Sequence, residues 1–387
     1  MENKTLFGEL PLGWKHVALS DVTTFISRGR QPKYIASVEG IPVINQKMIR
    51  NLTIDYRYVK YNDAKKNINK SVFIKIGDTL VNSTGVGTVG RSAYISIDPM
   101  RPTFVDSHVT IVRPDTAIVD PKFMSVVLSS DVYSNYMGST LAQGSTGQVE
   151  LSRQKLSKMC IPFPPLNTQH LIGTIFDLID QKIKLNHQIN KNLQKLKDDI
   201  WISQRVDKKT SLSNLMTIQS GKRPIDRYDN KFRLKELYPI IGANGVMGWT
   251  SKALTAGTII TTGRVGTHGV VNMFDEPVWV SDNSFVISSK YEEVAYEILR
   301  CDVKFLTLVH GTTQPLITQK DLKQYVVSIP SNDQLKKVNE HLKVYKNLIN
   351  VNNKQNKFLT ALRNLLLPKL LSGEIDLSDV KEVIQGD

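Results

Sequence analysis

The sequence lacks several features that would point to an exported, membrane-embedded or metal-binding protein. It contains two cysteines, Cys160 and Cys301, too few for a disulfide framework or a zinc site. We interpret both as small core residues and expect a reducing cytoplasm as the location. No apolar run reaches the length of a membrane span, and the first residues lack a secretory pattern.

Motifs of common catalytic and metal sites are also missing. The sequence has no His-Glu-x-x-His, no P-loop Gly-Lys-Ser/Thr and no cysteine pair with metal spacing. His108 and His310 stand beside Ser or Gly without a paired carboxylate at short range, which favours ordinary surface or core histidines. Residues 161–166 contain the consecutive pair Pro164-Pro165 but no donor or acceptor before it, as a base-methylating loop would need. We therefore predict a chain without catalytic residues.

Acidic residues are too few to balance the basic ones. The 387-residue chain has 50 Lys and Arg against 36 Asp and Glu, a net charge of +14. This balance favours a polyanionic partner, because Lys and Arg that neutralise phosphates release condensed counterions. A solvated basic surface is the alternative. The hydrophobic fraction of 41% is typical of a globular protein, and the length allows two or three domains.

The sequence is duplicated. At an offset of 166, residues 186–196 align with 352–362 with five identities, and Pro164 aligns with Pro330. The preceding regions also correspond, with shifting offsets: 18–22 with 211–215, 41–44 with 238–241, and 78–90 with 257–269. The chain is therefore predicted to run as globular part, helix, globular part, helix.

Apolar residues step by three and four along 172–200 and, less regularly, along 338–366, which is coiled-coil spacing. Two matched helices in one chain are expected to pair with each other and to hold the globular parts apart. Asn186 and Asn352 occupy the same core position, where a buried polar residue specifies register and partner. The predicted pairing residues are Ile172, Ile175, Ile179, Asn186, Ile189, Leu193, Leu196, Val338, Leu348, Asn352, Leu359, Leu362 and Leu366.

The globular parts show short alternating apolar bursts, such as 71–76, between Gly, Asn and Asp turns. This pattern predicts β-rich parts with a few helices, the clearer ones at 121–137 and 290–300. The predicted fold class is α+β: two β-rich domains, each followed by a long helix, with the helices paired as an antiparallel intramolecular coiled coil.

A glycine run, Gly85-Val86-Gly87-Thr88-Val89-Gly90, matches the Gly-x-Gly-x-x-Gly of dinucleotide-binding folds. A dinucleotide loop needs a helix directly after it, whereas residues 92–97 and their counterparts 270–274 are typical of strands. In the second copy, alignment on Val-Gly-Thr-x-Gly places Arg264 where Gly85 stands. We therefore predict a hairpin whose glycines serve positive-φ positions.

Polar and basic loop residues in both copies suit DNA binding, because Arg pairs with guanine, Asn or Gln with adenine, and small hydroxyls with phosphate. For any single residue, a solvated loop position is as good an interpretation, and the Ser/Thr/Gln loops could instead cap helices. The candidates are Arg28, Arg30, Lys33, Asn45, Gln46, Lys47, Arg91, His108, Ser145, Thr146, Gln148, Lys222, Arg223, Asn244, Arg264, His268, Asn283, Thr312, Thr313 and Gln314.

The order of these segments resembles the specificity (S) subunits of type I restriction-modification systems. The resemblance covers essentially the whole chain. It is carried by the duplicated Leu-Ser-Asp/Asn openings, the Ile/Tyr-Pro-Val/Ile-Ile strands, the Val-Gly-Thr-x-Gly turns, the Pro-Pro-Leu-x-x-Gln entry at 164–169 and the helix end at 365–375. It implies target-recognition domains at 1–165 and 206–330, conserved helical regions at 166–205 and 331–375, and a C-terminal tail at 376–387.

The resemblance also implies the function and the partners. A non-catalytic S subunit would read a bipartite, asymmetric double-stranded DNA target, one domain per half-site, with the helices setting the unread spacer. Two modification (M) subunits would dock on the helices and methylate adenine N6 after flipping the base. Restriction (R) subunits would join through them. S-adenosylmethionine, ATP and magnesium would belong to these partners, none to this chain, and the location would be the prokaryotic cytoplasm.

Two other functions stay open from the sequence. The chain could be a coiled-coil interaction scaffold that reads no bases, although its charge of +14 speaks against this. It could also be a self-contained S-adenosylmethionine-dependent methyltransferase that uses the glycine run.

Overall fold

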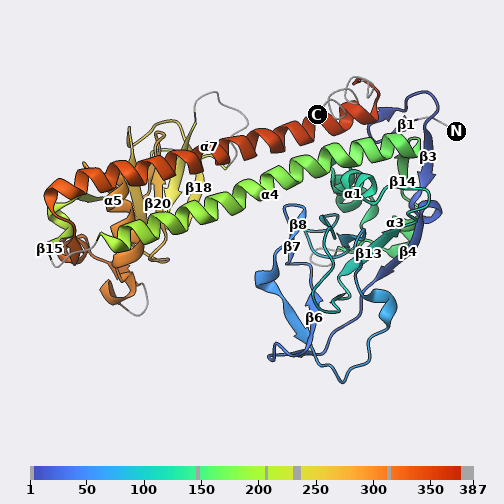
Figure 1. The fold of residues 1–387 in the computed structure, drawn as a ribbon, viewed down its shortest axis with the longest axis horizontal. Coiled ribbons are helices and arrows are strands. Elements are labelled where there is room, and N and C mark those ends of the chain that lie inside the picture. Colours follow the sequence, from blue (N-terminus) through green and yellow to red (C-terminus); the bar gives the residue numbers. More distant parts are fainter. Residues whose placement is uncertain (1–3, 145–148, 205–207, 230–236, 312–314, 376–387) are drawn as a thin grey trace. The chain divides into compact units, whose positions relative to one another are not determined.

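The chain forms two compact units in a computed structural model that describes residues 4–144, 149–204, 208–229, 237–311 and 315–375. Unit 1 is Met1–Leu185 with Gln355–Asp387, and unit 2 is Asn186–Lys354. Two long helices, α4 (Leu166–Ser203) and α7 (Asn332–Leu371), are each divided between the units, with about half of the helix in unit 1 and half in unit 2 (Figure 1). Among the described residues, no helix is both long and apolar enough to cross a membrane.

Unit 1 is built on two four-stranded sheets. The main sheet is antiparallel, in the order β11 (Ser92–Tyr94), β10 (Thr79–Asn82), β13 (Val109–Pro114) and β4 (Thr23–Arg28). The second has the order β12 (Phe104–Val105), β6 (Ile41–Ile44), β9 (Lys60–Asn62) and β5 (Tyr34–Ile35), with β12 and β6 parallel. Paired short strands complete it: β1 (Lys4–Thr5) with β2 (Gly8–Glu9), β7 (Ile49–Arg50) with β8 (Thr53–Ile54), and β3 (Lys15–Ala18) with β14 (Cys160–Phe163).

Unit 2 repeats this topology. Its main sheet has the order β20 (Val271–Phe274), β19 (Ile259–Gly263), β22 (Ser284–Ser288) and β16 (Thr217–Ser220). Its second sheet is β18 (Gly245–Thr250), β17 (Tyr238–Gly242) and β21 (Trp279–Val280), with β17 and β21 parallel. The remaining pairs are β15 (Lys208–Ser211) with β25 (Val326–Ile329) and β23 (Val309–His310) with β24 (Leu316–Ile317). The predicted α+β fold with two β-rich parts is thus confirmed.

The short helices follow equivalent strands in the two units. Unit 1 has α1 (Pro121–Ser129), α2 (Asp131–Tyr136) and α3 (Arg153–Ser157); unit 2 has α5 (Glu292–Glu297) and α6 (Gln319–Gln324). The single helix predicted at 121–137 is divided, because Ser130 caps α2 by accepting from the Tyr133 amide. Ser152 caps α3 in the same way.

The strand suggested by the alternation at 71–76 does not form. Asn69 accepts a hydrogen bond from the Ser71 amide and starts a 3-10 turn at Lys70–Val72. Val72 and Ile74 still point into the core, and Phe73 makes a single bridge to Phe104. The alternation indicated burial correctly, but the asparagine cap outweighed strand propensity.

The glycine run is a hairpin turn, as predicted, since it joins the antiparallel strands β10 and β11. The alignment that set Gly85 against Arg264 is wrong by two residues. Asn82 faces Val109 in unit 1, whereas Gly263 faces Ser284 in unit 2, so that Gly85 corresponds to Gly266. The identical residues Val-Gly-Thr-x-Gly suggested the wrong alignment, because the turn of unit 2 is shorter than that of unit 1. No helix follows either turn, and Gly85 and Gly266 both have positive φ (96° and 84°).

The long helices pack together in an antiparallel pair. In unit 1, Arg363 of α7 contacts Asp180 of α4 at 3.3 Å; in unit 2, Asn352 Nδ2 of α7 donates to Asn190 Oδ1 of α4 at 2.8 Å. The helix ends also enter the cores of the globular parts, Phe176 in unit 1 and Trp201 in unit 2 among them. The ends are therefore domain elements as well as pairing elements.

Three of the proposed pairing positions require correction. Ile189, Leu196 and Leu348 are 36%, 47% and 48% exposed. A straight helix drifts about 20° per heptad from a 3.5-residue repeat, so a stripe read as strict heptads leaves the interface. The other positions are buried (Ile172, Ile179, Asn186 and Val338) or half-buried (Ile175, Leu193, Asn352, Leu359, Leu362 and Leu366).

Candidate nucleic-acid interface

One end of the main sheet collects several loops in each unit, and we call it the loop end. In unit 1 it consists of residues 28–33, 45–47, 83–91, 106–108 and 149–151; in unit 2, of residues 220–223, 242–244, 264–269, 281–284 and 315–317. Backbone hydrogen bonds join the loops in the same pattern: Leu151 to Ser83 matches Ile317 to Arg264, and Asp106 to Ile44 matches Ser281 to Ile241.

A glycine holds the basic turn of each loop end against the sheet. Gly29 donates to the Val109 carbonyl and Gly221 to the Ser284 carbonyl. A Cβ on Gly29 would lie 1.8 Å from the Val105 oxygen, and one on Gly221 would lie 2.2 Å from the Ser281 oxygen. Only glycine permits this approach, which fixes the backbone of the basic residues beside it.

Gly29→Ala is expected to lower the free energy of unfolding by about 2 kcal/mol or more, because its Cβ meets backbone that cannot give way. Gly87→Ala is the matched control: nothing lies within 4 Å of its Cβ, and only its positive φ opposes the change, at a cost of about 1 kcal/mol. Urea unfolding of the full chain compares them, and equal losses would show that the close approach is not decisive.

Three polar side chains converge at the loop end of unit 1. Thr84 Oγ1 lies 3.1 Å from Gln46 Oε1 and 2.9 Å from His108 Nδ1. The threonine hydroxyl has one proton and gives it to Gln46, so His108 Nδ1 carries a hydrogen toward Thr84. The exposed imidazole then offers Nε2 outward. Gln46 and His108 were predicted as candidates, whereas Thr84 was missed.

The other unit 1 candidates separate into exposed and structural groups. Arg30, Lys33, Lys47 and Arg91 are exposed. Asn45 is buried and bonds the Tyr58 carbonyl and the Lys47 amide, so it shapes its loop and cannot reach a base. Arg28 is half-buried, with its guanidinium on Glu150 at 2.8 Å and on the Leu151 carbonyl at 2.7 Å. For Asn45 the structure corrects the prediction of a DNA contact.

In unit 2 the structure brings all six described candidates to the loop end. Lys222, Arg223, Asn244 and Asn283 are exposed, while Arg264 and His268 are half-buried. Arg264 donates to the Asp282 carbonyl at 3.4 Å, and His268 Nδ1 lies 3.4 Å from the Gly263 carbonyl. Ser145, Thr146, Gln148, Thr312, Thr313 and Gln314 lie outside the described residues.

Equivalent positions of the two loop ends carry different side chains. The carbonyls of His108 and Asn283 accept matching hydrogen bonds, from the Ser83 and Arg264 amides. The same correspondence places Ser83 with Arg264, Lys47 with Asn244 and Arg30 with Lys222. A common framework thus presents two chemically distinct sets of hydrogen-bonding groups.

Unit 1 has a second basic surface, of which only Lys47 was predicted. Residues 47–75 hold eight Lys or Arg and two Asp, a net +6 of the chain's +14. Arg50 lies over the Tyr58 ring at 5.0 Å and Lys60 over the Tyr34 ring at 4.8 Å. Such exposed pairs of cation and aromatic ring suit phosphate and sugar contacts. The Tyr-Arg-Tyr-Val-Lys-Tyr run at 56–61 was the available sequence signal.

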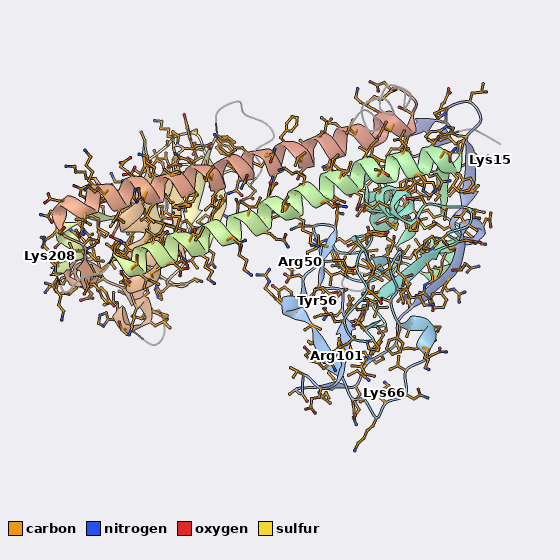
Figure 2. The ribbon with its side chains drawn as sticks, in the orientation of Figure 1. Lys15, Arg50, Tyr56, Lys66, Arg101 and Lys208 are labelled. Atoms are coloured by element: carbon orange, nitrogen blue, oxygen red, sulfur yellow. The ribbon has the colours of Figure 1, made fainter. Side chains whose placement is uncertain are left out.

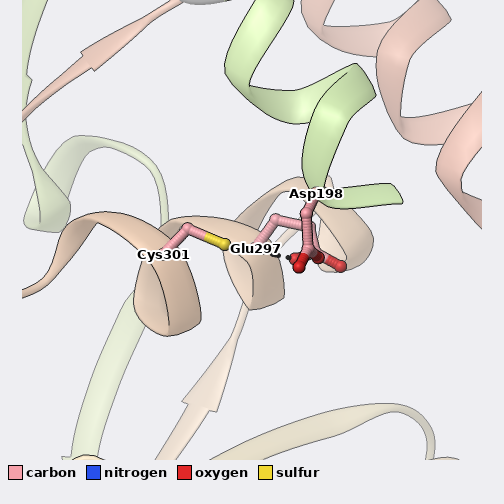
Figure 3. Close-up of side chains that lie close together, drawn as sticks. All are labelled: Asp198, Glu297 and Cys301. Atoms are coloured by element: carbon pink, nitrogen blue, oxygen red, sulfur yellow. Dashed lines mark hydrogen bonds between the residues drawn. The ribbon is translucent and has the colours of Figure 1, made fainter. Parts of the chain in front are cut away.

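Asp198, Glu297 and Cys301 form a cluster with metal-ligand chemistry in unit 2 (Figure 3). Cations of the protein already occupy it: Arg300 contacts Asp198 and Glu297, and Lys197 Nζ lies 3.2 Å from Glu297 Oε1. Burial raises the pKa of the Glu297 carboxyl and of the Cys301 thiol, which disfavours their anionic forms. The cluster is better explained as an ion network that joins α4 to the helix α5.

Comparison with known proteins gives concordant matches. The family described as type I restriction modification DNA specificity domain matches residues 11–195 and 207–361. The type I restriction enzyme HindI specificity subunit of Haemophilus influenzae is 23% identical, covering 94% of this chain and 99% of that protein. The putative type I restriction enzyme MjaX specificity subunit of Methanocaldococcus jannaschii is 23% identical, covering 96% of each.

A solved structure shows the same fold. The S subunit of a type I restriction-modification system from M. genitalium aligns with a TM-score of 0.55 at 17% identity, covering 96% of this chain and 99% of that one. The two family matches together span most of the sequence, and each contains one globular part and most of the helix that follows it. The chain therefore belongs to the type I restriction-modification DNA specificity family.

Proposed function

We propose that the chain reads an asymmetric double-stranded DNA target in two parts, one part with each loop end. The observation that carries this proposal is the repeated framework with different exposed groups, His108 and Lys47 in one unit and Asn283 and Asn244 in the other. Amides, imidazoles and cations on rigid loops provide the donors and acceptors that base edges require. The spacer between the half-sites would be set by the paired helices and left unread.

The long helices would dock two methyltransferase subunits. Leu178 and Leu185 on α4 are 54% and 50% exposed, and their counterparts at the 166-residue offset, Val344 and Val351 on α7, are 57% and 62% exposed. Within each pair the residues are seven apart and share a helix face. Because the chain shows the same apolar pair twice, two copies of one partner fit better than two different proteins.

Catalysis would lie entirely in those partners. The methyltransferase subunits would bind S-adenosylmethionine and modify adenine N6. Restriction subunits, which use ATP and magnesium, would join through them.

Footprinting of the complex with its methyltransferase subunits tests the proposal. We expect two protected patches of specified bases with an uncontacted gap between them. Continuous protection, or protection that is independent of sequence, would contradict reading in two parts.

The basic surface of unit 1 is expected to contact phosphates. Arg50→Gln with Lys60→Gln should reduce the salt slope of DNA binding by about one to two, with little change in the recognised sequence. Lys15→Gln with Lys158→Gln removes the same charge, and Figure 2 shows Lys15 in another part of unit 1 from Arg50. If both variants changed the salt slope equally, the loss of overall positive charge would explain the effect, and a specific role of Arg50 and Lys60 would be contradicted.

A further inference from the structure

Helices α1 and α5 occupy equivalent places, each following the central strand pair of its sheet and lying against the long helix that comes next in the chain. Lys122 is the second residue of α1 and Glu293 the second of α5. Both contact that long helix from the globular part. The two contacts can therefore be compared position by position.

The charges of these contacts are reversed between the units. In unit 1, Lys122 Nζ lies 3.4 Å from Asp177 and 2.7 Å from Asp180 of α4. In unit 2, Glu292 lies 3.1 Å from Lys343, and Glu293 lies 3.2 Å from Lys346, both on α7. Lys343 and Lys346 are the counterparts of Asp177 and Asp180 at the offset of 166.

In both units the other long helix supplies a basic side chain. Arg363 of α7 contacts Asp180 at 3.3 Å, and its counterpart Lys197 of α4 contacts Glu293 at 2.8 Å. The side chains of Lys197 and Glu293 are 3% and 0% exposed, so water could not compensate for a lost partner. Each unit thus has a three-element network whose acid lies on the long helix in unit 1 and on the short helix in unit 2.

The residue that caps the start of the short helix also lies on different elements in the two units. Asp120 caps α1 through the Phe123 amide at 2.7 Å, and a Cβ on Gly173 of α4 would lie 2.6 Å from the Asp120 carboxylate. At the counterpart of Gly173, α7 has Asn339, whose Oδ1 accepts from the Glu293 and Val294 amides. In unit 1 the capping residue, Asp120, belongs to the globular part, and Gly173 of α4 leaves space for it. In unit 2 the capping residue, Asn339, belongs to the long helix α7.

We propose that these contacts form an address that lets each globular part accept only its own following helix. A first globular part seated on α7 would place Lys122 among Lys343, Lys346 and Lys197, and Asp120 against Asn339. A second one seated on α4 would set Glu292 and Glu293 against Asp177 and Asp180, with no cap at position 173. Repulsion and misfit of this kind give specificity between otherwise similar surfaces. The address goes beyond DNA reading and fixes the order in which two half-site readers are mounted.

The first arm of the test reverses the signs in the full chain. Lys122→Glu should raise the rate of proteolytic cleavage within residues 109–141 about tenfold or more. Adding Asp177→Lys and Asp180→Lys, which copies the signs of unit 2, should restore the rate to within about twofold of the parent. Lys158→Glu, an exposed change of the same charge, serves as control. Absence of rescue overturns the proposal.

The second arm separates an address from an ordinary ion pair. Residues 15–163 are replaced by the second globular part, 208–329, on the parent helices or on helices that carry Gly173→Asn, Asp177→Lys and Asp180→Lys. We expect the transplanted part to resist protease only on the altered helices. Equal resistance on both overturns the proposal; if the transplant is digested on both, the rescue of Lys122→Glu in the first arm decides. Neither arm depends on DNA binding.

Discussion

Replacing Leu178 and Leu185 with Gln is expected to remove one of the two methyltransferase subunits that we propose to dock on the long helices. Both side chains are about half exposed on α4, in a part of the helix that otherwise contacts α1. Gln keeps helix propensity and charge unchanged, so the loss would come from the apolar contact itself. Central apolar contacts of this kind are typically worth 2 kcal/mol or more, on the order of 30-fold in affinity.

The duplication supplies the matched partner experiment. Val344→Gln with Val351→Gln should also remove one subunit, and all four changes should remove both. Ile97→Gln alters an apolar residue that is 65% exposed but lies outside the long helices, and it should leave the stoichiometry unchanged. Native mass spectrometry of the complex counts the subunits. Loss of both subunits from either pair alone would contradict two equivalent docking sites.

Exchanging the first globular part, residues 15–163, for that of another specificity subunit is expected to change one half of the methylated sequence and leave the other half intact. The reason is that each loop end is built from residues of one unit, and the backbone hydrogen bonds among its described residues join residues of that same unit. The incoming part should keep a basic residue at position 122, since Asp177 and Asp180 face that position. Sequencing of methylated sites reads the outcome.

If the sequence methylated by the chimera changed in both halves, or in neither, this would contradict the proposal that each unit reads one half-site. A chimera that fails to fold would report on the seating of the domain and not on reading. A second exchange that introduces Lys at position 122 separates these outcomes.

The duplication made most of the architecture predictable from sequence. Repeated segments gave the two-part organisation, alternating apolar residues gave the β-rich parts, and three- and four-residue spacing gave the helices, since these periodicities depend on burial. The strand ends gave the loop positions of Gln46, His108 and Asn283. The wrong predictions concerned local structure. A turn capped by Asn69 forms where a strand was predicted, and a two-residue difference in turn length shifted the alignment of Gly85.

Side-chain roles were less accessible than positions. Asn45 and His108 both follow or precede a strand, but Asn45 turns inward to bond the Tyr58 carbonyl while His108 stays exposed. The pairing of Arg50 with Tyr58 depends on a hairpin fold that the letters do not specify. The reversed charges of Lys122 and Glu293 have meaning only once α1 and α5 are known to be equivalent.

The most direct test of the central claim is single-molecule sequencing of methylated DNA from cells that express this chain with its methyltransferase subunit. Two loop ends with different side chains predict methylated adenines within one motif made of two different specified segments separated by a fixed run of unspecified bases. A single continuous motif, or methylation without sequence preference, would contradict the reading of DNA by two units.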